Sequence, residues 1–328
     1  AWFLQLPLLA GATTDLGYRA TFMVLVSLVD LAFLLFLLGR LGVATAAAWL
    51  VLVTLAGQLA LLRLDLVPAV LAGAGLLLAL RGRASASAVV IALGTAAKLW
   101  PILLFPLVLT RRGSRLRATG VFAAAGVVLA GASIAGAGLP RLLSPLDYQA
   151  DRGLQVEAVA ATLPMLAALS QPGYEVYYSV FKAYEIRGPG VPAMLQAASV
   201  ASVVALVLAA GLLVWWWLRD CPPEAGGYLG LLLVVLFIVT SKAYSPQYTL
   251  WVAALAVVLF GASRVDPARH ESLRAGLVLG LTGVLMLLTT TIYPTYYGAI
   301  VGRNEHSRFA LGALALRNSL ILALAALL

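Results

Sequence analysis

Long apolar stretches alternate with short polar segments along almost the whole chain. Most of these stretches have the length that a helix needs to cross the hydrocarbon core of a bilayer, about 20 residues. We predict helices at 21–38, 43–62, 66–80, 85–97, 102–109, 119–138, 193–218, 227–240, 249–262, 275–292 and 309–328. The pattern predicts an all-α fold: a polytopic transmembrane helical bundle of about ten to eleven hydrophobic segments. It forms a single transmembrane domain over residues 1–328, with one long extracytoplasmic loop at 139–192.

The composition supports the membrane assignment. Hydrophobic residues make up 62% of the 328 residues and charged residues only 11%, whereas soluble domains carry about 25% charged residues. A surface that faces water cannot be built from so few charges, so a soluble globular domain is excluded. We attribute the formal net charge of +9 to an excess of Lys and Arg in cytoplasmic loops, and we expect the lipid bilayer, not nucleic acid, as partner.

The residue types of familiar catalytic centres are scarce. One cysteine and two histidines exclude an internal disulfide and a Cys/His metal cluster, so no metal site is predicted. The sequence contains no Walker, HExxH or Ser-His-Asp motif, and we expect no cofactor and no direct use of ATP. Small residues at 72–75 are attributed to close helix packing. The chain begins with Ala1 inside an apolar stretch, and we expect an N-terminal part to precede it.

The stretch 85–109 contains Lys98 and, three residues later, Pro101. A lysine is costly inside a membrane, and proline interrupts a helix. We therefore predict two short helices that meet at Lys98 on the outer side, so that the basic clusters at 81–83 and 111–117 both face the cytoplasm. This topology places most of the unusual polar segments on the outer side, which favours an active surface on the extracytoplasmic face of a multi-pass plasma-membrane protein.

Four outer segments combine cations with other polar or aromatic residues. Arg63 and Asp65 lie at a junction of two spans, either as a local ion pair at a helix end or as a polar anchor at the rim of a binding cavity. Lys98 either reaches up to the membrane interface or binds a phosphate near the membrane surface. The other two segments are 242–248, which is richer in polar groups than a plain turn requires, and 302–308.

The long loop mixes charged and aromatic residues at 147–157, and the apolar stretch 158–169 that follows is predicted as an amphipathic or short interfacial helix. Its aromatic residues form either a belt at the membrane interface or a surface that stacks on sugar rings. They are Tyr174, Tyr177, Tyr178, Phe181 and Tyr184. Arg317 lies within the last span, where we expect it to be paired, with Asp30 as one candidate partner, or to face a cavity.

The segments 63–65 and 98–101, together with 151–157 and 242–248, resemble stretches of the GT-C membrane glycosyltransferases. The resemblance is closest to glycosyltransferase family 87, the polyprenyl-phosphate-mannose-dependent alpha-1,2-mannosyltransferases of actinobacteria, and it runs across most of the chain. It implies that an acidic residue in the first outer loop deprotonates the acceptor hydroxyl, while cations hold the departing lipid phosphate. That aspartate is expected before Ala1.

The resemblance implies an inverting membrane glycosyltransferase of the outer face. The enzyme would move a sugar, with mannose favoured, from a polyprenyl-phosphate donor to a glycolipid or cell-envelope glycan. Asp65 is the remaining candidate for catalysis. The candidates for binding the donor phosphate are Lys98, Lys242, Arg63, Arg303 and His306. The candidates for binding the sugar or acceptor are Tyr244, Gln247, Tyr248, Arg152, Gln155 and Glu157.

Two other classes of protein stay open at this point. A polytopic secondary transporter or lipid-linked sugar flippase would also have many helices with broken segments and intramembrane charge. A protein of that class should contain an internal repeat, which is not evident in the sequence. It should also have its polar groups at mid-membrane, whereas the polar segments here cluster on one side. A non-catalytic membrane scaffold would not need cations on four separate outer segments.

Overall fold

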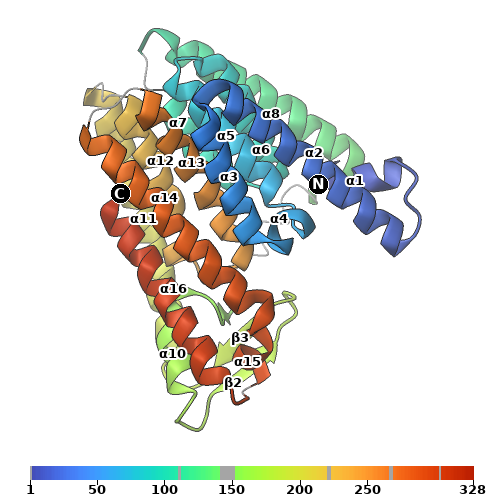
Figure 1. Cartoon of the computed structure of the whole chain (residues 1–328), viewed down its shortest axis with the longest axis vertical. Coiled ribbons are helices and arrows are strands. Elements are labelled where there is room, and N and C mark those ends of the chain that lie inside the picture. Colours follow the sequence, from blue (N-terminus) through green and yellow to red (C-terminus); the bar gives the residue numbers. More distant parts are fainter. Residues whose placement is uncertain (1, 110–111, 141–151, 220–222, 266–268, 303) are drawn as a thin grey trace.

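The computed structural model describes residues 2–109, 112–140, 152–219, 223–265, 269–302 and 304–328, and its helices assemble into a bundle (Figure 1). The helices of the first part of the chain are α1 (Trp2–Leu9), α2 (Asp15–Leu41), α3 (Val43–Ala56), α4 (Gln58–Leu62), α5 (Leu66–Leu80), α6 (Ala84–Ala97), α7 (Phe105–Val108) and α8 (Arg115–Ala137). Those of the second part are α10 (Thr162–Ala167), α11 (Val191–Arg219), α12 (Pro223–Thr240), α13 (Thr249–Val265), α14 (Arg269–Thr290), α15 (Tyr297–Gly302) and α16 (Ser307–Leu327).

The length and apolar character of the helices confirm an all-α polytopic bundle. Within the described residues, six helices are long and apolar enough to cross a membrane, and α3, α5, α6 and α12 contribute shorter apolar segments. The most apolar windows of α8 and α11 contain almost no buried residues. Such apolar exposure is stable in lipid but not in water, so the bilayer is the solvent for these helices.

The centre of the bundle is α13, against which α3, α5, α12 and α14 pack. Every side chain of α13 from Thr249 to Leu259 is buried. Helix α5 approaches α13 closely because Gly73 has no side chain: a Cβ atom there would lie 2.9 Å from the carbonyl oxygen of Ala254. The close packing predicted for the small residues at 72–75 is therefore confirmed.

The chain breaks at Lys98, as predicted. Helix α6 ends at Ala97, Lys98 has an extended backbone with φ −156° and ψ 140°, and the chain continues in the 3-10 helix η1 (Trp100–Leu104). The returning segment packs on α6 where Gly94 leaves room, since a Cβ atom at Gly94 would lie 3.3 Å from Pro101. Proline at the second position of η1 is compatible with its start but not with a continuous helix through Lys98.

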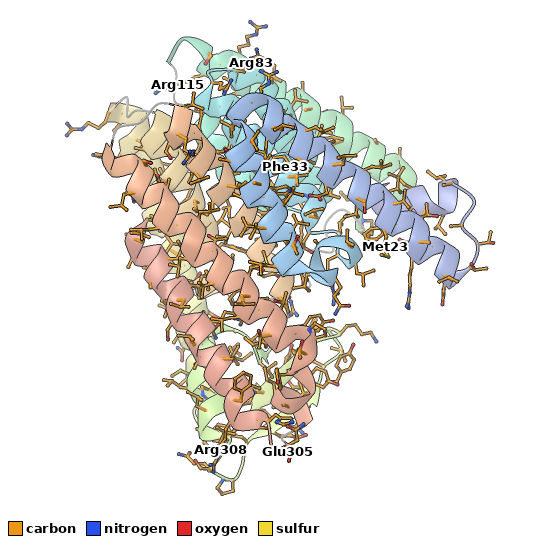
Figure 2. All side chains as sticks on the ribbon, in the orientation of Figure 1. Met23, Phe33, Arg83, Arg115, Glu305 and Arg308 are labelled. Carbon is orange, nitrogen blue, oxygen red and sulfur yellow. The ribbon has the colours of Figure 1, made fainter. Side chains whose placement is uncertain are left out.

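The basic clusters on either side of this break lie at one end of the bundle. Figure 2 shows Arg83 and Arg115 at the same end, with Glu305 and Arg308 at the opposite end. Arg81 also reaches this first end, where its guanidinium donates to the backbone carbonyl of Arg40. We call it the basic end, and we call the opposite end, where residues 152–190 lie, the loop end (Figures 1 and 2).

The described part of the long loop forms a small folded unit at the loop end, which we call the loop unit (residues 152–190). It contains three short antiparallel strands, β1 (Leu154–Gln155), β2 (Glu175–Tyr178) and β3 (Tyr184–Arg187), in the order β1-β3-β2. Ile186 lies opposite both Leu154 and Val176. These apolar side chains join a second hydrophobic core with α15 and α16. The strands are too short to produce a clear alternating pattern, and the sequence did not predict them.

The apolar stretch 158–169 is mostly helical and packs against the helical bundle. It forms η3 (Val159–Ala161) and α10, and Ala158, Ala161 and Met165 are buried. Helix α10 packs against α16. The predicted helix is therefore a packed element of the loop unit, with Leu163 left 70% exposed.

Candidate functional site

A cavity of about 680 Å³ lies between the loop unit and the neighbouring helix ends. Four cationic side chains and six aromatic side chains line it, together with one carboxylate among the described residues. The lining residues are Arg63, Lys98, Arg152, Gln155, Glu157, Tyr178, Phe181, Lys182, Ala183, Tyr184, Ser245, Pro246, Gln247, Tyr248, Tyr293 and Tyr297. A wall with this excess of cations favours a ligand that carries an anionic group.

Lys98 reaches the cavity from the break between α6 and η1. Its Nζ lies 2.6 Å from Oδ1 of Asp65, and the indole N–H of Trp251 donates to the same oxygen at 2.8 Å. Asp65 is only 4% exposed, so its charge is held behind the cavity wall. The expectation of a local ion pair between Arg63 and Asp65 is wrong, because Lys98 is the cation that Asp65 binds.

An aromatic stack holds the Lys98 ammonium from the side. The rings of Trp100 and Trp251 stack at 4.8 Å between centroids, and those of Tyr248 and Trp251 stack at 4.0 Å. Lys98 Nζ lies 5.2 Å from the Tyr248 centroid and 5.1 Å from the Trp251 centroid, within the range of cation–π attraction. An ammonium has three N–H donors, so Lys98 can bind Asp65 and still donate to a ligand.

Arg63 forms a second cationic part of the cavity wall. Its guanidinium donates to the hydroxyl of Tyr293 at 2.9 Å and lies 5.7 Å from the ring centroid. Tyr293 belongs to a π-helical turn, Thr291–Thr295, that follows α14. This contact joins the connection between α4 and α5 to the turn that follows α14.

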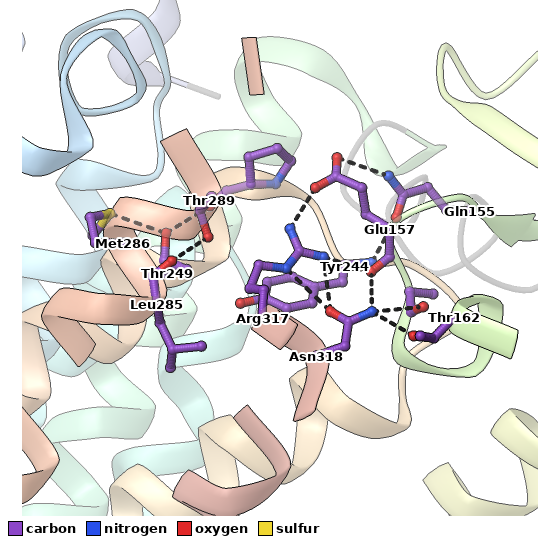
Figure 3. Close-up of polar contacts among 12 residues, drawn as sticks. Gln155, Glu157, Thr162, Tyr244, Thr249, Leu285, Met286, Thr289, Arg317 and Asn318 are labelled. Atoms are coloured by element: carbon purple, nitrogen blue, oxygen red, sulfur yellow. Dashed lines mark hydrogen bonds and ion pairs between the residues drawn. The ribbon is translucent and has the colours of Figure 1, made fainter. Parts of the chain in front are cut away.

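At the wall of the cavity, Glu157 forms an ion pair with Arg317, and both side chains are fully buried (Figure 3). The guanidinium donates to Glu157 Oε2 at 2.6 Å and to the Glu157 backbone carbonyl at 2.8 Å, and it also donates to Asn318 Oδ1. It lies 4.1 Å from the centroid of the Tyr244 ring. Burial raises the pKa of the Glu157 carboxyl, and the Arg317 charge acts against that rise. The pair fastens the loop unit to α16.

The prediction of Asp30 as a partner of Arg317 is wrong. Asp30 instead accepts a hydrogen bond from the indole N–H of Trp49 at 2.8 Å. From α16, Arg317 binds Glu157 of the loop unit, a residue 160 positions earlier in the chain.

Gln155 connects the loop unit to the segment 241–248. The Oε1 atom of Gln155 accepts a hydrogen bond from the backbone N–H of Tyr244 at 3.0 Å. The backbone N–H of Gln155 donates to the backbone carbonyl of Lys242 at 3.0 Å. Tyr244 is completely buried, and burial raises its pKa to about 12, so the phenol stays protonated at neutral pH. The loop unit and this segment therefore form one continuous wall of the cavity.

A second, apolar pocket of about 220 Å³ lies between α11 and α12. Residues of both helices line it, together with Leu103, Ser241 and Lys242. The lining residues are Leu103, Ser202, Ala205, Leu206, Ala209, Leu233, Leu236, Phe237, Thr240, Ser241 and Lys242. The segment that starts at Lys242 thus separates an apolar pocket from the cationic cavity.

The structure brings together seven of the predicted site residues on the cavity wall: Arg63, Lys98, Arg152, Gln155, Glu157, Gln247 and Tyr248. Asp65 and Tyr244 lie buried behind the wall, and Lys242 lines the apolar pocket. His306 is not among the lining residues; it lies 3.6 Å from Glu305 and is largely exposed. Arg303 and the start of the segment 151–157, Asp151, lie outside the described residues.

Sequence reasoning missed several residues of the wall. Lys182 lies at the turn between β2 and β3, where its φ is +55°, and no local pattern singled it out. Tyr293 and Tyr297 follow the span predicted at 275–292, and the sequence analysis did not single them out. The other candidate segments stand out because they contain charged or polar residues. Aromatic residues beside a predicted span do not stand out in this way. Arg317 was recognised as unusual, but its partner was not.

The fold and the cavity define a polytopic helical membrane protein with a cationic, aromatic-lined site at one end of its bundle. The family model of glycosyltransferase family 87 matches residues 3–241, which is more than half of the chain. The chain therefore belongs to glycosyltransferase family 87 and is a membrane glycosyltransferase. The match ends just before Lys242, so it covers the loop unit but not α13 to α16. No curated protein and no solved structure matches the chain.

Proposed function

We propose that this glycosyltransferase transfers mannose from a polyprenyl-phosphate donor to a glycolipid or cell-envelope glycan at the outer face of the plasma membrane, with inversion. Membership of family 87 supports sugar transfer. The donor class rests on the resemblance of the segments 63–65 and 98–101 and on the site. The single observation that carries the proposal is a cationic cavity, with Lys98 and Arg63 in its wall, beside an apolar pocket.

The site matches an amphiphilic donor. A polyprenyl phosphate has a long apolar tail and an anionic head, and the two pockets provide the corresponding apolar and cationic surroundings. Lys242 lines the apolar pocket, and its carbonyl binds Gln155, which lines the cavity. In the proposal the tail lies along α11 and α12, and the phosphate lies in the cavity near Lys98.

The chemistry follows from these positions. The bond between the sugar C1 atom and the phosphate oxygen breaks, a new bond forms between C1 and the acceptor oxygen, and a carboxylate takes the acceptor proton. The lipid phosphate leaves as an anion, which Lys98 and Arg63 stabilise by fixed positive charge, in place of a bound metal. Asp65 is assigned a positioning role, because it holds Lys98 and does not line the cavity.

The test is a transfer assay with protein reconstituted in lipid vesicles, labelled polyprenyl-phosphate mannose and a glycan acceptor. The double variant Lys98→Met/Asp65→Asn removes both members of the pair, so no buried charge is left alone. We expect its kcat to fall about 10²-fold or more, the loss that follows removal of one donor to a developing anion.

The control variant is Arg19→Met, which removes an exposed cation that does not line the cavity and should transfer sugar normally. Normal kcat in the Lys98→Met/Asp65→Asn variant would exclude Lys98 from the site. Passage of the intact lipid-linked sugar across the vesicle membrane without transfer would instead identify a flippase.

A further inference from the structure

Four tyrosines form a continuous row along the cavity wall, which we call the tyrosine row: Tyr178, Tyr184, Tyr297 and Tyr293. The ring centroids of successive members lie 5.1, 5.9 and 5.1 Å apart, and each pair meets edge to face. The row begins on the β2–β3 hairpin of the loop unit, crosses to α15 and ends in the turn after α14. All four side chains line the cavity.

The two ends of the row lie in different surroundings. At one end, Tyr293 accepts a hydrogen bond from Arg63, which lines the same cavity as Lys98. At the other end, Tyr178 is 57% exposed on the loop unit. The row therefore leads from the contact with Arg63 to the exposed surface of the loop unit.

The chemistry of the row fits a carbohydrate. Aromatic faces carry partial negative charge and attract the C–H faces of a pyranose ring, while phenol hydroxyls both donate to and accept from sugar hydroxyls. An isoprenoid fits a mostly apolar pocket better, and such a pocket exists separately between α11 and α12. Three ring-to-ring steps also extend beyond the width of one pyranose ring, so the row can contact more than one sugar unit.

We propose that the tyrosine row is the binding site for the acceptor, and that the acceptor is an oligosaccharide of at least two sugar units whose reactive end lies near Arg63. The proposal rests on the proposed function, because it assigns the donor phosphate to the Lys98 part of the cavity. The tyrosine row, and not the cations, then selects a glycan acceptor over a simple alcohol or a lipid hydroxyl.

The test compares manno-oligosaccharides of one to four units as acceptors in the vesicle assay. For the wild-type protein the acceptor KM should fall with chain length until the row is filled. In Tyr178→Ala and Tyr184→Ala the KM for the longer acceptors should rise about tenfold, the effect of losing one aromatic contact of this kind. The KM for the polyprenyl-phosphate donor should not change.

Two further variants separate binding from folding. Tyr184→Phe keeps the ring and should retain most of the length dependence, which a general folding defect would not allow. Tyr296→Ala removes a neighbouring tyrosine that packs on His306 and Phe309 and does not line the cavity, so its acceptor KM should match the wild type.

Saturation-transfer NMR with a mannotriose probe and no donor measures binding independently of transfer. Signal from the wild type that Tyr178→Ala loses supports the row even if the assay donor is not the right one. An unchanged acceptor KM in both alanine variants, while transfer proceeds, would overturn the inference and leave the proposed function intact. A rise in donor KM instead would assign the row to the donor and overturn it as well.

Discussion

At Lys98, a single carboxylate oxygen of Asp65 receives both an ammonium and an indole N–H, while the lysine remains 33% exposed. We expect Lys98→Met alone to lower the free energy of unfolding by about 1–3 kcal/mol, because it leaves the buried carboxylate with one partner. In Lys98→Met/Asp65→Asn most of that loss should be recovered. Thermal unfolding in detergent micelles measures both. Equal unfolding temperatures for the two variants would show that the pair has no such coupling.

The pair of Arg317 and Glu157 is more deeply buried and gives a sharper prediction. Neither side chain is exposed, so Arg317→Met leaves an uncompensated charge and should cost about 3–5 kcal/mol of stability. Glu157→Leu/Arg317→Met replaces both charges by apolar groups and should restore most of it. Chemical unfolding of the purified variants checks this. If Arg317→Met unfolded like the wild type, the ion pair would not hold the loop unit on α16.

These two lysine and arginine sites also mark the limit of prediction at the residue scale. A cation in an apolar stretch must have a partner or a wet cavity, so the sequence alone indicated that Lys98 and Arg317 were special. It could not name the partners, because Asp65 and Glu157 lie 33 and 160 positions away. Those contacts exist only after the helices and the loop unit have packed.

At the scale of elements, the contact between α5 and α13 is limited by Gly73. Gly73→Ala places a Cβ atom 2.9 Å from the backbone oxygen of Ala254, and backbone cannot move aside as a side chain can. We expect a loss of about 1–3 kcal/mol from overpacking. Gly120→Ala in α8 is the matched control, since nothing lies within 4 Å of its added Cβ. Thermal unfolding that ranked Gly120→Ala as the less stable variant would contradict this packing.

The elements differ in how well their sequence specifies them. Apolar stretches such as 66–80 and 249–262 became helices within a few residues of the predicted limits, because in lipid a helix satisfies every backbone hydrogen bond within one segment. The break at Lys98 followed from the chemistry of lysine and proline. The three strands of the loop unit depend on pairing between distant residues such as Leu154 and Ile186, which no local pattern reveals.

At the scale of the whole molecule, the break at Lys98 determines which surfaces share one side of the membrane. The cavity contains Lys98, Lys182 and Ser245 together, whereas Arg83 lies at the basic end (Figure 2). In a background where the single cysteine is replaced, Cys221→Ala, we expect Lys182→Cys and Ser245→Cys to react with a membrane-impermeant thiol reagent added to intact cells. Arg83→Cys should react only after the membrane is opened.

Single-cysteine labelling at positions 98 and 245 tests the same arrangement most directly, because these positions lie on two segments far apart in the chain that meet at one cavity. If one reacted only from outside and the other only from inside, the cavity could not exist as a single site, and a phosphate could not be bound by Lys98 beside Gln247 and Tyr248. Reaction of both from the outer side would place the cavity where an acceptor glycan and a lipid-linked sugar can meet. That position would allow the sugar to be transferred on the outer side of the membrane.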